Sequence, residues 1–305
     1  MNAWTRFKNS YLLYSFKRDP IAIISFVVLS VLAIISILAP VIAPYNAYDT
    51  ATFDIMDAET PPAWMEGGNE SFILGTDIQG RDLLSTMIYG LRVSFLIGVG
   101  AVLLQALVGI VVGLLSGYLG GKLDAFLMRI ADIQFSIPYL IVAIFTAAIF
   151  KLAYGVGRYE ELAVPLLIVI IGMSEWPKYA RTVRASVLGE KNKEYVEAAR
   201  VIGISRWHIM YRHVLPNTLT PVLVISTIQV AEAVMSEAAL SFLGLGMPVT
   251  KPSLGALIRA GFEYIFSGSW WITFFPGVLL AFLILVILLL GDWLRDVFNP
   301  KLYKG

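Results

Sequence analysis

The stretch EYVEAARVIGISRWHIMYRHVLPN, residues 194–217, is a polar and basic segment between two apolar parts of the chain. It contains two glutamates and an asparagine together with three arginines and two histidines. Its first half has helical spacing until Gly203, where a glycine lets the chain turn without strain. Residues 203–216 predict a second amphipathic helix that ends near Pro216. We expect two short helices that form a compact unit outside the membrane, although the periodicity alone fits a solvated basic loop equally well.

The composition is that of a membrane protein. Of 305 residues, 58% are hydrophobic, whereas a soluble domain is usually about half apolar. The net charge of +1 gives no reason to expect a nucleic-acid partner. The absence of cysteine excludes disulfides, thiolate metal sites and cysteine nucleophiles. The first apolar run, residues 21–44, is longer than the apolar region of a cleaved signal peptide, so we expect a retained span.

The apolar runs predict an all-α membrane protein with about six transmembrane helices, because lipid offers no hydrogen-bond partner to an open backbone. The expected spans lie near residues 21–43, 94–119, 130–151, 162–177, 218–242 and 272–291. Lysine and arginine favour an orientation with both termini in the cytoplasm, which places 17 of the 23 inside and 6 outside.

This topology divides the chain into four parts. They are a cytoplasmic N-terminal segment (1–20), the first transmembrane helix with a long external loop (21–91), a transmembrane core (92–292) that includes a cytoplasmic loop at 178–217, and a cytoplasmic tail (293–305). Near the end of the external loop, Asp77, Gly80, Arg81 and Asp82 are candidate turn and capping residues for a short helix that begins near GRDLLS.

Polar residues inside the fifth expected span have two interpretations. Intramembrane carboxylates usually face the interior of a bundle or a wet cavity. Gln229 and Glu232 share a helix face, so they are candidates for lining a translocation path. Glu237 lies closer to the outside, where it would meet arriving substrate or help to gate the outer mouth. The alternative is that these side chains hydrogen-bond between helices and hold them together.

Two further spacings predict helix contacts. Gly109, Gly113 and Gly117 recur every four residues, and such a face of small residues lets another helix approach closely, within the subunit or in a partner. Arg129 and Asp132 are three residues apart, so a local ion pair is expected.

No motif for nucleotide binding or catalysis is present in the sequence. The nearest approach to a phosphate-binding loop, at Gly121-Lys122, has Ser116 in place of the first glycine and Leu123 in place of the Ser or Thr. His208 and His213 would lie about 140° apart on an α-helix, so they would not converge on a metal. We therefore expect no catalytic residue, no metal ligand and no cofactor in this chain.

The opening stretch also carries the pattern EAA, three residues, G, and a terminal LP, which resembles the signature of ABC importer permeases. The matching residues are Glu197, Ala198, Ala199, Gly203, Leu215 and Pro216. His213 stands where this family usually has an apolar residue. Four more segments resemble the C-type subunit of the peptide and nickel class of these permeases: LGTDIQGRDLLSTMIYGLRVSFLIG (74–98), SGYLGGKLDAFLMRIADIQFSIP (116–138), SEAALSFLGLGMP (236–248) and GDWLRDVFNPKL (291–302).

The resemblance implies a type I ABC importer transmembrane domain in the bacterial cytoplasmic (inner) membrane, surrounded by lipid. Its EAA loop would be a coupling helix that docks on an ATPase subunit. The implied partners are a second permease subunit, two ATP-binding cassette subunits that bind ATP and magnesium, and an extracytoplasmic substrate-binding protein.

The cargo implied by the resemblance is a di- or oligopeptide, with a nickel chelate, glutathione or a sugar as alternatives. The spans show no cluster of His or Met suited to a bare metal ion, which favours peptide. A different class of function is a proton-coupled secondary carrier with Glu232 and Glu237 as proton relays. A purely structural membrane anchor fits poorly with acids in a span.

Overall fold

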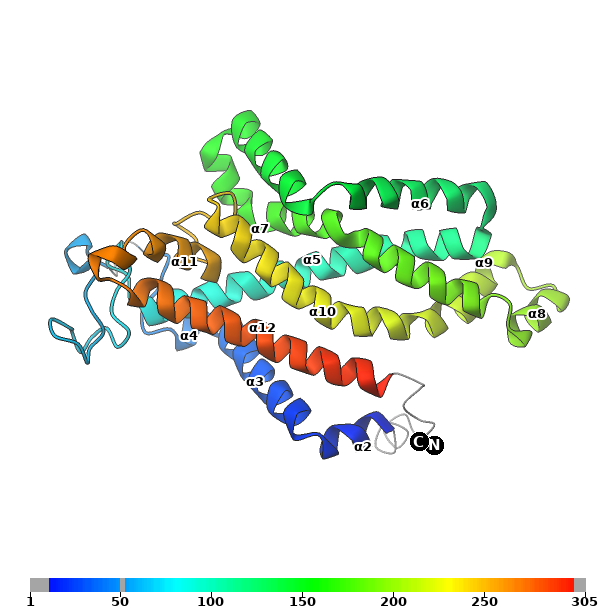
Figure 1. The fold of residues 1–305 in the computed structure, drawn as a ribbon, viewed down its shortest axis with the longest axis horizontal. Coiled ribbons are helices and arrows are strands. Elements are labelled where there is room, and N and C mark those ends of the chain that lie inside the picture. Colours follow the sequence, from blue (N-terminus) through cyan, green and yellow to red (C-terminus); the bar gives the residue numbers. More distant parts are fainter. Residues whose placement is uncertain (1–10, 50–52, 299–305) are drawn as a thin grey trace.

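A computed structural model describes residues 11–49 and 53–298, and in these ranges the chain is almost entirely helical (Figure 1). The helices are α2 (Tyr11–Arg18), α3 (Pro20–Ile37), α4 (Ala39–Ile42), η2 (Ile55–Asp57), α5 (Leu83–Leu119), α6 (Gly121–Ser136), α7 (Tyr139–Glu190), α8 (Glu194–Val201), α9 (Arg206–Ile209), η3 (Met210–Val214), α10 (Leu215–Phe242), α11 (Leu254–Phe262), η4 (Ile265–Ser267) and α12 (Trp271–Val297). The expectation of an all-α membrane protein is confirmed.

Five helical segments in the described part of the chain are long and apolar enough to cross a membrane, where the sequence predicted about six. They are Pro20–Ile37, Leu83–Leu119, Tyr139–Glu190, Arg206–Phe242 and Trp271–Val297. The difference arises in α7, a single 52-residue element that contains a reversal at Gly155. Gly155 has φ 80° and ψ 163°, a conformation that glycine adopts without the steric cost of a side chain.

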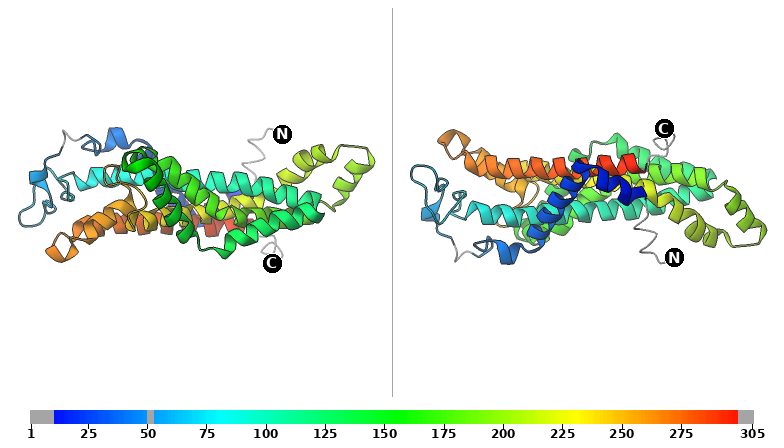
Figure 2. Two further views of the ribbon diagram at one scale, coloured as in Figure 1. Left: turned by 90° about the horizontal axis from the view of Figure 1, so that it is seen from above. Right: turned by 90° about the horizontal axis from the view of Figure 1, so that it is seen from below.

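The helices form an elongated bundle, and its connections gather at the two ends (Figure 1). The segment before α5, together with α11 and η4, lies at one end. The α8–α9 segment lies at the opposite end, where it projects past the other helices (Figure 2). The connecting segments therefore lie at two opposite ends of the bundle.

The helix α5 begins earlier than expected. The side chain of Asp82 accepts a hydrogen bond from the backbone N–H of Ser85 at 2.8 Å, as an N-cap does. The helix that starts there has 37 residues instead of being a short separate one, so the span expected to start at residue 94 begins at Leu83. Buried Leu83 anchors this first turn against Leu257 and Trp271.

The external loop is fixed to the bundle by a buried arginine. Arg81 is 4% exposed, and its Nε donates to Asp77 Oδ2 at 2.7 Å. A second guanidinium nitrogen donates to the carbonyl of Val249 at 3.0 Å, which links this loop to the segment after α10. A paired and hydrogen-bonded charge of this kind can stay buried, so this part of the loop is an ordered component of the fold.

The central contact of the bundle is between α5 and α7, and the glycines at spacing four lie in it. A Cβ atom on Gly109 would be 2.2 Å from the Cβ of Tyr179, and one on Gly113 would be 2.4 Å from the carbonyl oxygen of Ala180. A Cβ atom on Gly117 would be 2.8 Å from the Cβ of Val187. These glycines therefore let two helices of the same subunit pack backbone against backbone.

The third expected span is divided. Residues 121–136 form the separate amphipathic helix α6, which ends before Pro138, because the residue before a proline is disfavoured in the α conformation. Asp132 does not form the expected pair with Arg129; its Oδ1 contacts Arg181 of α7 at 2.6 Å. Asp124 accepts two hydrogen bonds from Arg184, both at 2.7 Å, which hold the pKa of this carboxyl below its ordinary value.

Candidate functional site

The turn between α8 and α9 is built around Gly203. This residue has φ 85°, in the left-handed region. Its N–H donates to the carbonyl of Arg200 at 3.0 Å, and the N–H of Ile204 donates to the carbonyl of Ala199 at 3.1 Å. These two bonds close a helix C-terminus as a Schellman motif does. No atom lies within 4 Å of where a Cβ would be, so the backbone conformation, and not packing, requires the glycine.

The second helix of this segment does not end near Pro216, and that expectation is wrong. Residues 206–242 form one helical run in which α9 passes through a π-turn, η3, into α10. The N–H of Leu215 donates to the carbonyl of Met210, five residues back. Pro216 therefore lies within this run, directly after the π-turn, and does not end the helix.

The π-turn also changes the relation of the two histidines. The ring centroids of His208 and His213 are 6.1 Å apart, so the expected separation of 140° around the helix is wrong. A π-helix has more residues per turn than an α-helix, which brings positions five apart towards the same side. In the described residues, no group of three or more His, Cys, Asp or Glu side chains is arranged to hold a metal ion.

The projecting segment is joined to two long helices by specific contacts. Buried Ala199 and Ile209 belong to the main apolar core. The hydroxyl of Tyr195 donates to Glu190 at the end of α7 at 2.7 Å, and it accepts from Asn217 of α10 at 3.1 Å. Lys191, the residue that follows α7, in turn donates from its ammonium to the carbonyl of Gly117 near the end of α5 at 2.8 Å. A force applied to the segment would therefore reach α7 and α10 directly, and the end of α5 only through the end of α7.

The outward side of this segment is exposed and partly apolar. Glu197 and Ala198 of the EAA pattern are exposed, whereas Ala199 is buried. The neighbouring large apolar side chains are also exposed: Val201, Ile202, Trp207 and Tyr211. We call these six exposed residues the loop face. Trp207 and Tyr211 stack, with ring centroids 6.5 Å apart, and exposed large apolar side chains that gather at the end of a bundle are typical of a protein contact.

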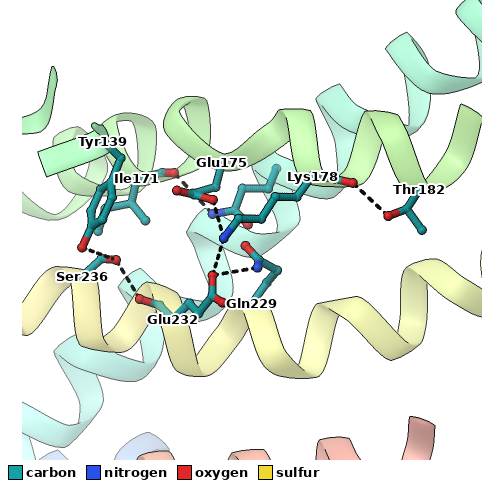
Figure 3. A network of polar contacts seen from close by, with 9 residues as sticks. Tyr139, Ile171, Glu175, Lys178, Thr182, Gln229, Glu232 and Ser236 are labelled. Carbon is teal, nitrogen blue, oxygen red and sulfur yellow. Dashed lines mark hydrogen bonds and ion pairs between the residues drawn. The ribbon is translucent and has the colours of Figure 1, made fainter. Parts of the chain in front are cut away.

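A second site lies inside the bundle around Glu232 (Figure 3). Gln229 donates to Glu232 Oε2 at 2.8 Å, as their shared helix face predicts. Lys178 of α7 places its ammonium 2.5 Å from the same carboxylate oxygen and 2.7 Å from Glu175. These groups border a cavity of about 280 Å³ between α5, α7 and α10. Its lining is Gln105, Tyr139, Ile171, Glu175, Lys178, Gln229, Glu232, Ala233, Met235 and Ser236.

Sequence reasoning missed the contribution of α7 to this cavity. Lys178 was assigned to a cytoplasmic loop at 178–217, but α7 continues to Glu190 and directs Lys178 at Glu232. Glu175, in the predicted fourth span, and Lys178, directly after its predicted end, are three residues apart, so their spacing was an available signal for a polar face if the helix continued.

Glu237 does not belong to this cavity. Its side chain is 0% exposed and accepts hydrogen bonds from Ser94 of α5 at 2.9 Å and from Ser241 at 2.6 Å. The contact with Ser94 favours, for this residue, the interpretation that a buried carboxyl holds helices together.

Comparison with known families agrees with the pattern of the projecting segment. Residues 109–304 match the family model described as binding-protein-dependent transport system inner membrane component. Residues 2–62 match the model for the N-terminal transmembrane domain of oligopeptide transport permease C.

Curated relatives match over nearly the whole chain. The dipeptide transport system permease protein DppC of Haemophilus influenzae is 36% identical over 289 residues, which cover 95% of this chain and 93% of the relative. DppC of Escherichia coli K12 is 37% identical and covers 94% of this chain and 91% of the relative. The oligopeptide transport system permease protein OppC of Bacillus subtilis is 32% identical and covers 95% and 88%.

Solved structures support the fold. A chain of the inward-facing MetNI methionine ABC transporter aligns with a TM-score of 0.56 at 22% identity, covering 71% of this chain and 98% of that one. A second crystal form of the same transporter aligns with a TM-score of 0.54.

Proposed function

Because the chain belongs to the family of binding-protein-dependent transport system inner membrane components, we propose that it is one permease subunit of an ATP-driven importer for di- or oligopeptides. The relatives named as dipeptide and oligopeptide permeases support this cargo. The importer would lie in the bacterial cytoplasmic membrane, with a second permease subunit completing the path.

The observation that carries the proposal is the α8–α9 segment, which projects beyond the bundle (Figure 2), carries the loop face and contacts the ends of α7 and α10 through Tyr195. In this proposal the loop face docks on an ATP-binding cassette subunit. ATP and magnesium would be bound by two such subunits, and this chain would contribute no catalytic residue. Closure of the ATPase pair would move α8 and α9, and through them α7 and α10.

The opposite end of the bundle would receive the cargo. An extracytoplasmic substrate-binding protein would dock on the ordered external loop, where Arg81 links the segment before α5 to the segment after α10. Movement of α7 against α10 would then open the path alternately to the two sides of the membrane.

A cross-linking experiment tests the coupling. The sequence contains no cysteine, so Ala198→Cys introduces a single thiol in the loop face. In membranes that contain the whole transporter, a short thiol cross-linker should join this residue to an ATPase subunit. The matched control is Glu70→Cys, an exposed site in the external loop, which should give no such product.

The transport assay tests the class of function. Proteoliposomes that contain the purified transporter and its binding protein should accumulate a labelled dipeptide only when ATP is present inside. Uptake driven by a proton gradient without ATP would establish the secondary carrier instead. ATP-driven uptake of a nickel chelate, glutathione or a sugar, without uptake of peptide, would correct the cargo and keep the machinery.

A further inference from the structure

We propose that the cavity around Glu232 binds a protonated amino group, so that it holds the free amino terminus of the cargo during passage. This inference rests on the proposed function, because a peptide would supply that group. It is carried by the hydrogen-bonding capacity of two buried amides and by the charges beside them.

The orientation of both amides follows from their partners. Gln105 Nε2 donates to the carbonyl oxygen of Ile171 at 3.3 Å, and Gln229 Nε2 donates to Glu232 Oε2 at 2.8 Å. Carbonyl and carboxylate oxygens only accept hydrogen bonds. Rotating either side-chain amide by 180° would place its Oε1 against the oxygen of its partner, which would be repulsive. Each Nε2 is therefore the atom that faces the partner oxygen. Each amide oxygen must then act as an acceptor elsewhere.

These two oxygens are acceptors without a donor. Gln105 is 1% exposed and Gln229 is 2% exposed. Within the described residues, neither Oε1 atom has a hydrogen-bond partner. Both residues line the same cavity. A buried acceptor that stays unpaired destabilises the fold, so native structures nearly always provide a donor. An N–H donor that reaches either oxygen from the cavity would satisfy it.

The charges of the cavity select a cation. Glu175 and Glu232 are two carboxylates, and Lys178 between them is one ammonium, at 2.7 Å and 2.5 Å respectively. The described charges that line the cavity therefore sum to one negative charge when all three are ionised. Because Lys178 is already engaged by both carboxylates, it is not free to bind an anionic end of a peptide.

The cavity has room for more than a solvent molecule. Its volume of about 280 Å³ compares with about 30 Å³ for one water in the liquid. Met235 also lines it and is 54% exposed, so the cavity reaches the surface of this chain. The amino end of a peptide, with its first side chain, can enter there.

Two small compounds test the inference directly. Alaninamide carries an ammonium and no carboxylate, and N-acetylalaninamide differs by having no ammonium. In the assembled transporter carrying Met235→Cys, each compound is tested for slowing the reaction of the single thiol with a neutral maleimide. Alaninamide should protect at a concentration at least about tenfold lower than N-acetylalaninamide, because only an ammonium makes charge-assisted hydrogen bonds there. Glu70→Cys, in the external loop, should be protected by neither.

Two second-site variants identify the acceptors. Gln229→Leu and Gln105→Leu, each in the Met235→Cys background, remove one amide oxygen and keep a similar volume. Either change should weaken protection by alaninamide about tenfold, and a variant is scored only if it purifies as an intact complex. Equal protection by the two compounds would show that the cavity does not select an ammonium, and protection by neither would show that it binds neither compound; either result would overturn the inference. Uptake by the wild-type complex separates the two proposals: ATP-driven dipeptide uptake by the wild type without selective protection in the Met235→Cys complex overturns only the amino-group site, whereas absence of ATP-driven uptake by the wild type overturns the proposed function.

Discussion

Replacing Gly113 with alanine tests the central α5–α7 contact. The added Cβ would lie 2.4 Å from the carbonyl oxygen of Ala180 and 2.8 Å from the Cβ of Val183. Ordinary contacts begin at 3.4 Å, so α5 and α7 would have to separate locally by about 1 Å. The obstructing oxygen belongs to helical backbone, which cannot move aside as a flexible side chain would. The contact therefore has to be broken or strained.

The expected cost follows from two opposing effects. Overpacking of one methyl group against backbone costs about 1–3 kcal/mol. Alanine has a better helix propensity than glycine by about 1 kcal/mol, which offsets part of that cost. Gly189 is the matched control, because it is also in a helix of this pair but has no atom within 4 Å of an added Cβ. Gly189→Ala should be neutral or stabilising, and Gly113→Ala should destabilise by up to about 2 kcal/mol in net terms.

Thermal unfolding of the purified chain in detergent, followed by circular dichroism, measures the difference between the two variants. Gly113→Ala should unfold at a lower temperature than the wild type, and Gly189→Ala at the same or a higher temperature. If the two variants unfold at the same temperature, the close approach of α5 and α7 does not contribute to stability in the way argued above.

Three further predictions follow from other contacts. Gly203→Val should abolish ATP-driven uptake, because a β-branched residue is strained at φ 85°. Gly203→Asn should retain most of the uptake, because Asn tolerates this conformation. Normal uptake by the valine variant would refute the role of the turn. Arg81→Lys should lower the unfolding temperature, because one ammonium cannot reproduce the guanidinium contacts to both Asp77 and Val249, and an unchanged temperature would show that the external loop is held by other contacts. The Arg184 guanidinium holds the pKa of Asp124 below its ordinary value, so their bond stabilises the fold at pH values above the ordinary Asp pKa. This stabilisation is lost as the pH falls through the lowered pKa, so the stability difference between wild type and Asp124→Asn should be present at pH 7 and shrink below about pH 4. A stability difference that is constant with pH would contradict the role of this ion pair.

The sequence predicted the apolar helices better than the residues at which they begin, bend and end. Hydropathy located the apolar helices because lipid imposes a length and a composition on each of them. The cap at Asp82 and the turn at Gly203 were readable because each depends on one local residue type. The glycine face of α5 predicted a close neighbour, but spacing alone cannot say that the neighbour is α7.

What the sequence did not reveal depends on hydrogen-bond register and on distant contacts. In the π-turn before Pro216, a backbone N–H bonds to the carbonyl five residues back instead of four. No residue type in the sequence predicts this change of hydrogen-bond register. The role of Lys178 was hidden because the positive-inside rule counts a lysine by its place along the chain, whereas its side chain is directed by the rotation of α7 towards Glu232. The polar cavity needs three helices brought together, so only the fold could reveal it.

The helical run from Arg206 to Phe242 has 37 residues and includes a π-turn and Pro221; at 1.5 Å per residue it is about 55 Å long. The exposed Trp207 lies in its first turn, and Glu232 lies about 38 Å further along at the same rise. A rotation of the whole run by about 5° around its first turn would displace that carboxylate sideways by roughly 3 Å, which is more than the 2.5 Å that now separates it from Lys178. A small rotation at the projecting end would therefore be large enough to separate this partly exposed ion pair.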